Sequence, residues 1–86
     1  MSQEKEKTLE KFIRCQQSAK TLLGADYITR IQPRKDILSA VMKENQVKEV
    51  QALLILSQKP AYKKDPMGQV LFMAACAELI QDKVSV

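Results

Sequence analysis

Residues 67–80 read Met-Gly-Gln-Val-Leu-Phe-Met-Ala-Ala-Cys-Ala-Glu-Leu-Ile, and eleven of these fourteen residues are apolar. The pair Asp65-Pro66 precedes the stretch and favours a helix start, because Asp caps a helix and Pro fits its first turn. At the helical repeat, the apolar residues leave no wide polar face. The stretch therefore predicts a helix at about residues 66–82 that is buried on nearly every side.

An 86-residue chain has little other mass with which to cover such a helix. Either the remaining helices enclose it completely, or a second copy or a partner protein supplies part of the cover. The small residues Ala74, Ala75 and Ala77 allow another backbone to approach closely. We expect the chain to work as an assembly, either as a homodimer or bound to a protein partner.

The composition indicates a helical protein with one core. The chain is 45% hydrophobic and 28% charged, which is typical of globular proteins. Two glycines, three prolines and 5% aromatic residues argue against an architecture of strands and turns. The predicted fold is all-α, a single domain over residues 1–86, arranged as a small irregular four-helix bundle with the helix at about 66–82 in its centre.

Local patterns predict the first two helices. Apolar residues spaced by three and four predict a helix over about residues 4–23, which ends at Gly24 because glycine can take the left-handed cap. A short turn at residues 26–31 follows. Pro33 fits the first position of the next helix, over about residues 33–45.

A further helix is predicted over about residues 46–58. Asn45 can take a left-handed conformation that closes the preceding helix, and Lys59-Pro60 ends the new one. The connector at residues 60–64 is polar and basic. The net charge of +4 is mostly spread along helix faces, and its one local excess lies in the lysines around Tyr62.

Targeting and redox features favour a cytoplasmic protein. The sequence begins with polar residues that lead into an amphipathic pattern, so we expect no secretory signal. The apolar run at 67–80 is too short for a membrane span and contains Gln69 and Glu78. Cys15 and Cys76 each lie in an apolar helical stretch, which suits reduced core thiols, although a disulfide between first and last helices is the alternative.

No residue pattern predicts catalysis. The chain has no histidine, and its acids are paired with bases along helix faces or placed as caps. Cys15 lies on an apolar face, where a packed thiol is expected rather than a nucleophile. Two cysteines without histidine cannot complete a zinc site. We therefore expect a non-enzymatic protein with no cofactor, metal or small-molecule ligand.

A nucleic-acid hypothesis has one specific form. Residues 37–57 align with a helix-turn-helix, with Ala40 in the small position of the first helix and Val50 and Leu53 facing the core. The turn lacks the usual glycine, and Lys48 is the only cation between Gln46 and Gln58. A small DNA-binding regulator with helices at about 33–45 and 46–58 is thus the alternative function.

The amount of apolar helix surface favours protein binding instead. Short, helical, histidine-poor chains of this kind are typical of small adaptors, chaperones and inhibitors. We predict a module that self-associates or binds a helical segment of a partner, with a basic loop at the rim of its contact surface. The predicted contact residues are Leu54, Leu56, Tyr62, Lys63, Lys64, Leu71, Phe72 and Leu79.

Overall fold

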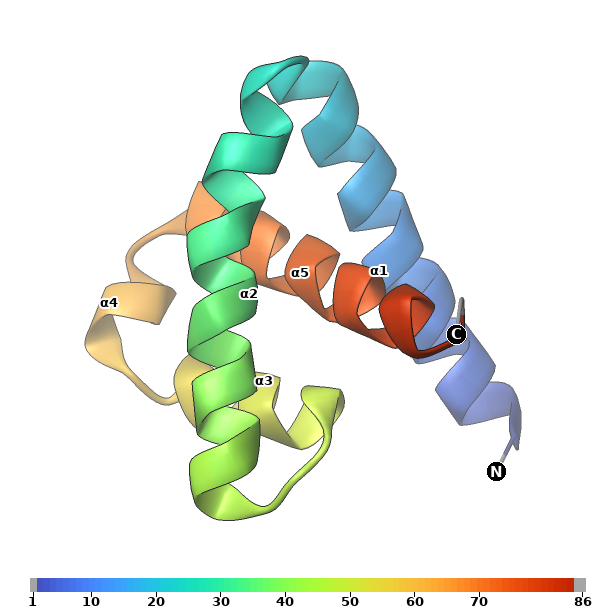
Figure 1. Cartoon of the computed structure of the whole chain (residues 1–86), viewed down its shortest axis with the longest axis vertical. Coiled ribbons are helices and arrows are strands. Elements are labelled where there is room, and N and C mark those ends of the chain that lie inside the picture. Colours follow the sequence, from blue (N-terminus) through green and yellow to red (C-terminus); the bar gives the residue numbers. More distant parts are fainter. Residues whose placement is uncertain (1, 85–86) are drawn as a thin grey trace.

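The computed structural model is helical throughout the part of the chain that it describes, which is the backbone of residues 2–84 and the side chains of residues 7–83. The helices are α1 (Ser2–Leu23), α2 (Asp26–Asn45), α3 (Glu49–Ser57), α4 (Pro60–Lys63) and α5 (Pro66–Val84). Figure 1 shows α1 and α2 joined at one end like the arms of a V, with α5 crossing between them. Since residues 2–84 contain no strand, the all-α prediction is confirmed.

Helix α5 is the central helix, because it packs against each of the other four. Five side chains in its middle turns are completely buried, namely Leu71, Ala74, Ala75, Cys76 and Ala77. The small side chains allow the neighbouring helices to approach its backbone closely. The chain's own helices therefore enclose the middle of α5, and no second copy is needed to cover these turns.

Helix α1 packs along α5 through an apolar contact and a polar one. Phe12 and Ala19 are buried against the core, and the side chain of Gln16 is 3% exposed. The Gln16 amide exchanges two hydrogen bonds with the Gln81 amide, at 2.9 and 3.1 Å, and also donates to the Glu78 carboxylate. A buried amide paired in this way fixes the register of α1 on α5.

The prediction of a separate turn at residues 26–31 and of a new helix at Pro33 is wrong, because α2 continues through the proline. A proline inside a helix costs about 3 kcal/mol, since it lacks an N–H and its ring clashes with the carbonyl of the preceding turn. Tyr27, Ile31 and Leu38 form one buried stripe that crosses Pro33. Burial of such side chains contributes about 1.5–3 kcal/mol each, which offsets the cost.

The junction between α2 and α3 lies slightly later than the sequence predicts. Gln46, rather than Asn45, takes the left-handed conformation, with φ 54° and ψ 47°. Asn45 stays in α2, where its side-chain amide donates to the carbonyl of Val41 at 2.9 Å. Lys48 is extended, so α3 begins at its successor and is shorter than the predicted 46–58.

Ion pairs join α2 and α3 to the C-terminal half of α5. Lys83 Nζ lies 2.7 Å from the buried Glu49 carboxylate at the start of α3, and Lys35 of α2 lies 3.1 Å from Asp82. Both cysteines are free thiols in the described structure, as the prediction of reduced core thiols requires. The Cys76 thiol lies 3.8 Å from the Glu49 carbonyl, to which it donates.

Several large apolar side chains remain at the surface although the core is closed. They are Leu22, Ile28, Ile37, Val50, Leu54, Ile55 and Met67. Single exposed apolar residues are normal in proteins, so an exposed apolar residue indicates a binding surface only where it joins other apolar residues in a patch or groove. None of the helices described here has the length and hydropathy that a bilayer crossing requires.

Candidate partner-binding groove

An apolar groove of about 280 Å³ opens where α2, α3, α4 and α5 meet. Its lining residues are Ile37, Leu56, Lys59, Ala61, Tyr62, Asp65, Gly68 and Phe72. Most of these side chains are apolar, and the polar ones lie on α4 or on the segments at either end of it. The groove formed by these eight residues combines apolar surface with basic charge.

Phe72 of α5 connects the helices that form the groove. Its ring centroid lies 5.8 Å from that of Tyr62 on α4, and the two ring planes are tilted by 40°. The guanidinium carbon of Arg34 on α2 lies 5.7 Å from the same centroid. Aromatic and cation–π contacts of this kind are worth about 0.5–1.5 kcal/mol each, so they hold Phe72 in place beside the open space.

Helix α4 forms within a segment that the sequence predicts only as a polar, basic connector. Pro60 supplies its first residue, and the extended Lys59 precedes it. The side-chain amide of Gln69 on α5 donates to the Tyr62 carbonyl at 2.9 Å, which ties the end of α4 to α5. This single turn places the Tyr62 ring against Phe72.

The start of α5 closes one end of the groove. Asp65 caps α5 as predicted, because its carboxylate accepts a hydrogen bond from the Gly68 backbone N–H at 3.0 Å. A Cβ at position 68 would come too close to that carboxylate, so a larger residue there would have to displace the Asp65 cap. The Asp65 carboxylate therefore caps α5 and is already engaged by the chain's own backbone.

The charge around the groove is mainly positive. Lys59 lines it, and Lys63 and Lys64 are exposed on and just after α4. Among the described lining residues Asp65 is the single acid. Burial raises the pKa of Tyr62, so its hydroxyl stays protonated at physiological pH and remains a hydrogen-bond donor.

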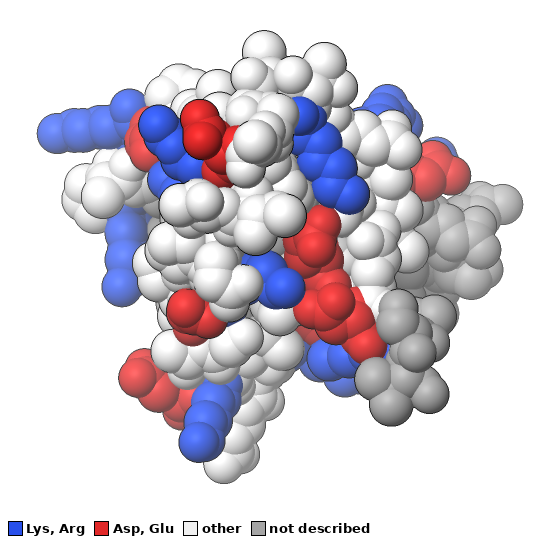
Figure 2. Space-filling model, turned by 45° about the horizontal axis from the view of Figure 1, so that its top comes forward, with Lys and Arg blue, Asp and Glu red and all other residues white. Residues whose placement is uncertain are grey.

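Figure 2 shows one face of the molecule. There, basic and acidic side chains are interspersed, with wide areas of other residues between them. Interspersed charge is typical of a solvated surface rather than of a site for a polyanion.

The structure brings together three of the predicted contact residues. Leu56, Tyr62 and Phe72 line the groove. Lys63 and Lys64 belong to the same corner because they lie on or next to α4. Lys63 and Lys64 themselves are outside the lining of the groove.

The other three predicted contact residues lie elsewhere. Leu71 is completely buried within the chain, and Leu79 is partly buried two turns beyond Phe72 on α5. Leu54 is 58% exposed but is not among the residues that line the groove. In this conformation Leu71 has no surface to offer a partner.

Sequence reasoning missed Ile37 and Arg34 at the groove. Ile37 is 43% exposed, whereas its neighbour Leu38 is fully buried. Adjacent residues differ by about 100° around a helix, so the burial of one does not imply the burial of the next. That spacing was the available signal for Ile37, whereas nothing in the sequence pointed to Arg34.

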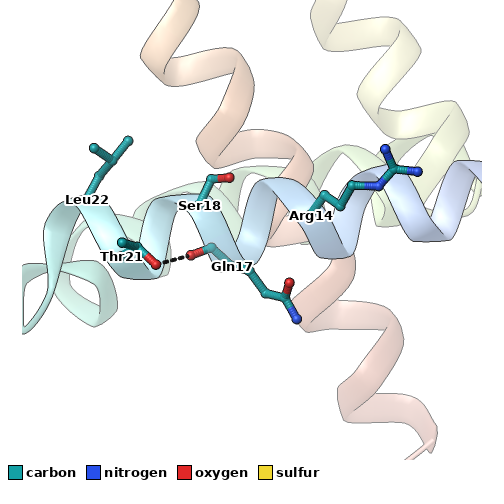
Figure 3. Close-up of a pocket in the computed structure, with 5 residues that line it drawn as sticks. All are labelled: Arg14, Gln17, Ser18, Thr21 and Leu22. Carbon is teal, nitrogen blue, oxygen red and sulfur yellow. Dashed lines mark hydrogen bonds between the residues drawn. The ribbon is translucent and has the colours of Figure 1, made fainter.

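A second hollow, of about 480 Å³, lies on α1 and is lined by Arg14, Gln17, Ser18, Thr21 and Leu22. Figure 3 shows that these five side chains project from one helix and diverge from one another. The Thr21 hydroxyl bonds its own helix, donating to the Gln17 carbonyl at 3.0 Å. A hollow on one helix with diverging groups cannot enclose a ligand, so it is not a candidate site.

The half-buried polar cluster around Glu78 serves packing. Tyr27 donates to the Glu78 carboxylate at 2.9 Å, and Lys20 lies 4.0 Å from the same oxygen. Burial raises the pKa of Tyr27, and the hydrogen bond and charge of Glu78 raise it further. Tyr27 is therefore a fixed donor that joins α2 to α5, and it cannot act as a base at ordinary pH.

The geometry of α2 and α3 does not favour the helix-turn-helix hypothesis. Ala40, expected in the small contact position, is exposed, and Val50, expected to face the core, is 41% exposed. Leu53 is buried as expected. Exposed Leu54 and Val50 make the outer face of α3 apolar, which is unsuited to contact with phosphates.

Comparison of the chain with protein-family models, with curated proteins and with solved structures gives no match.

Proposed function

We propose that this chain is a non-enzymatic protein-interaction module that holds a helical segment of a partner protein in the groove formed by Ile37, Leu56, Tyr62 and Phe72. The observation that carries the proposal is the groove itself: apolar surface from four helices beside a basic edge. Amphipathic helices commonly bind in such grooves through apolar anchors spaced by three or four residues.

The size of the groove favours a protein side chain over a small molecule. Small-molecule sites usually enclose about 300–1,000 Å³ and bury most of the ligand. The groove offers about 280 Å³ and is open to solvent along one side. One or two apolar side chains of a docking segment fit this space, with aromatic residues of the module around them as an interface core requires.

The charge favours a foreign acidic segment over a second copy. Lys59 lines the groove, Lys63 and Lys64 lie on or next to the adjacent helix α4, and the chain as a whole carries a net charge of +4. A second copy would bring like charge to this edge, whereas an acidic segment would be attracted to it. Self-association therefore stands as the competing outcome, with the apolar face of Leu54 as its other surface.

The test is a selection of helical peptides by display on the folded protein. Affinities of the recovered peptides are then measured for the wild type and for two matched variants on α2. Ile37→Lys places a charge in the groove, where Ile37 is 43% exposed. Ile28→Lys makes the same substitution outside the groove, where Ile28 is 73% exposed. Circular dichroism confirms that both variants fold.

The expected result is at least a tenfold loss of affinity in Ile37→Lys, equal to about 1.4 kcal/mol, and less than a twofold change in Ile28→Lys. Failure to enrich any peptide, or equal effects of the two variants, would overturn the proposal. A dimer mass in light scattering that Ile37→Lys converts to a monomer would show that a second copy occupies the groove instead.

A further inference from the structure

Arg34 lies beside the groove, next to the lining residue Phe72. It precedes Ile37 by three residues on α2, so the two side chains share one face of that helix. Its guanidinium lies 5.7 Å from the centre of the Phe72 ring, and Phe72 lines the groove. A cation is thus held next to the apolar space by an aromatic ring.

The hydrogen bonds of Arg34 are incomplete. An arginine carries five N–H donors in a planar fork. One terminal nitrogen donates to the Arg30 carbonyl at 3.1 Å, but the Nε atom is buried without an acceptor among the residues described. It is the one buried side-chain nitrogen or oxygen in that part of the chain with no partner. Buried donors are nearly always paired, and because this Nε is enclosed, a group from outside the chain can reach the guanidinium only through its terminal nitrogens.

Other basic residues that reach the core have carboxylate partners. Lys35 pairs with Asp82, and Lys83 pairs with Glu49. The acids close to Arg34 in sequence or at the groove are already used: Asp36 accepts from Gln32 at 3.1 Å, and Asp65 caps α5. The ion pairs found among the described residues leave Arg34 without a carboxylate.

We propose that Arg34 receives a carboxylate from the bound partner segment, so that the partner is an acidic amphipathic helix. This inference rests on the proposed function, because it names the chemistry of the segment in the same groove. A guanidinium binds a carboxylate through two parallel hydrogen bonds, and a stacked aromatic ring keeps its plane in place. Lys59 at the groove adds attraction for the same charge.

The spacing of Arg34 and Ile37 makes the proposal specific. They are one helical turn apart, about 5 Å along the axis. A partner helix that places an apolar anchor beside Ile37 therefore places a residue three or four positions away beside Arg34. Peptides selected on the wild-type protein should carry Asp or Glu at that spacing from their apolar anchor.

The test is a double-mutant cycle with the peptide selected most strongly on the wild type. One arm changes the peptide's acidic residue to Gln or Asn, and the other uses the protein variant Arg34→Gln. Arg14→Gln on α1 is the matched control, since Arg14 pairs at 3.9 Å with Glu10 on an exposed face. The change in the peptide should cost about tenfold in affinity for the wild type and for Arg14→Gln, but less than twofold for Arg34→Gln.

A spectroscopic readout reports the contact directly. The chain has three arginines, at positions 14, 30 and 34, so the Nε–H signals of the labelled protein can be assigned by substitution. The Arg34 signal should move on binding the acidic peptide and should stay in place with the Gln peptide. Arg14 should not respond to either one.

The outcomes separate this inference from the proposed function. Two results would overturn the role of Arg34 alone. In the first, the selected peptides depend on Ile37 for binding but contain no acidic residue. In the second, loss of the peptide's acidic residue lowers the affinity equally for the wild type and for Arg34→Gln. Binding that ignores Ile37→Lys would overturn the proposed groove and this inference together. Should Arg34→Gln fail to fold, the peptide substitution measured on the wild type and the Arg34 signal still decide the question.

Discussion

Leu71→Ala should destabilise the protein more than a surface change of the same type. Leu71 is completely buried in the middle of α5, where other helices pack around it. The substitution removes three buried carbons, worth about 0.8 kcal/mol each, and leaves a cavity that adds a comparable cost. We expect the free energy of unfolding to fall by about 3–5 kcal/mol, measured by urea denaturation followed by circular dichroism.

Leu54→Ala is the matched control, because Leu54 is 58% exposed on α3. The same loss of carbons there should cost less than about 1 kcal/mol, since most of that side chain already contacts water. Thermal melting should agree, because 1 kcal/mol corresponds to about 4–8 °C in a domain of this size. Equal losses in the two variants, or a loss below about 1 kcal/mol for Leu71→Ala, would refute the enclosed position of α5.

Four further predictions concern local features of the fold. Pro33→Ala should raise the free energy of unfolding by about 1 kcal/mol or more in urea denaturation, because it restores a hydrogen bond inside α2. Gly68→Ala should gain less than the roughly 1 kcal/mol that alanine usually adds over glycine in a helix, because the new Cβ displaces the Asp65 cap. Burial, followed by the charge of Glu49, raises the pKa of the Cys76 thiol from 9.0 to about 12, so alkylation of the native protein at pH 8 should modify Cys15 first. Below pH 9 the Cys76 thiol keeps its proton in both the folded and the unfolded chain, so its contribution to stability is complete. As the pH rises from 9 toward 12, the unfolded chain releases this proton first, and that contribution is lost. Melting temperatures should therefore fall over that range.

Helix ends that depend on local chemistry could be predicted from the sequence. Gly24 takes the left-handed conformation with φ 55°, and α1 ends beside it. Asp65-Pro66 starts α5 as predicted. Such signals need no knowledge of the rest of the fold, because the cap and the fixed φ of proline act within one turn.

The course of α2 could not be read from Pro33 alone. A proline is compatible both with a helix start and with a helix interior whose packing offsets its cost. The deciding feature is the stripe of Tyr27, Ile31 and Leu38, which spans the proline at helical spacing. Weighing that stripe above the local signal would have given the continuous helix.

The same error hid part of the groove. The rotation of α2 about its axis determines whether Ile37 or Leu38 faces the core, and a helix that starts at residue 33 leaves that rotation undetermined. Leu56, Tyr62 and Phe72 were predicted as contact residues from their apolar or aromatic character, and the fold brings them into one groove. The position of Arg34 over Phe72 depends on how α2 crosses α5, which is a tertiary property.

The isoleucine methyl groups provide the most direct test of the groove as the binding surface. Three of the six isoleucines report on different surfaces: Ile37 lies in the groove, Ile28 lies near the α1–α2 corner, and Ile55 lies on α3. The selected peptide is titrated into protein labelled at these methyl groups, and the signals are followed by NMR. We predict that the Ile37 signal moves most and that Ile28 and Ile55 stay in place. A titration that moves Ile28 or Ile55 and leaves Ile37 unchanged would contradict the proposal that the groove holds the partner.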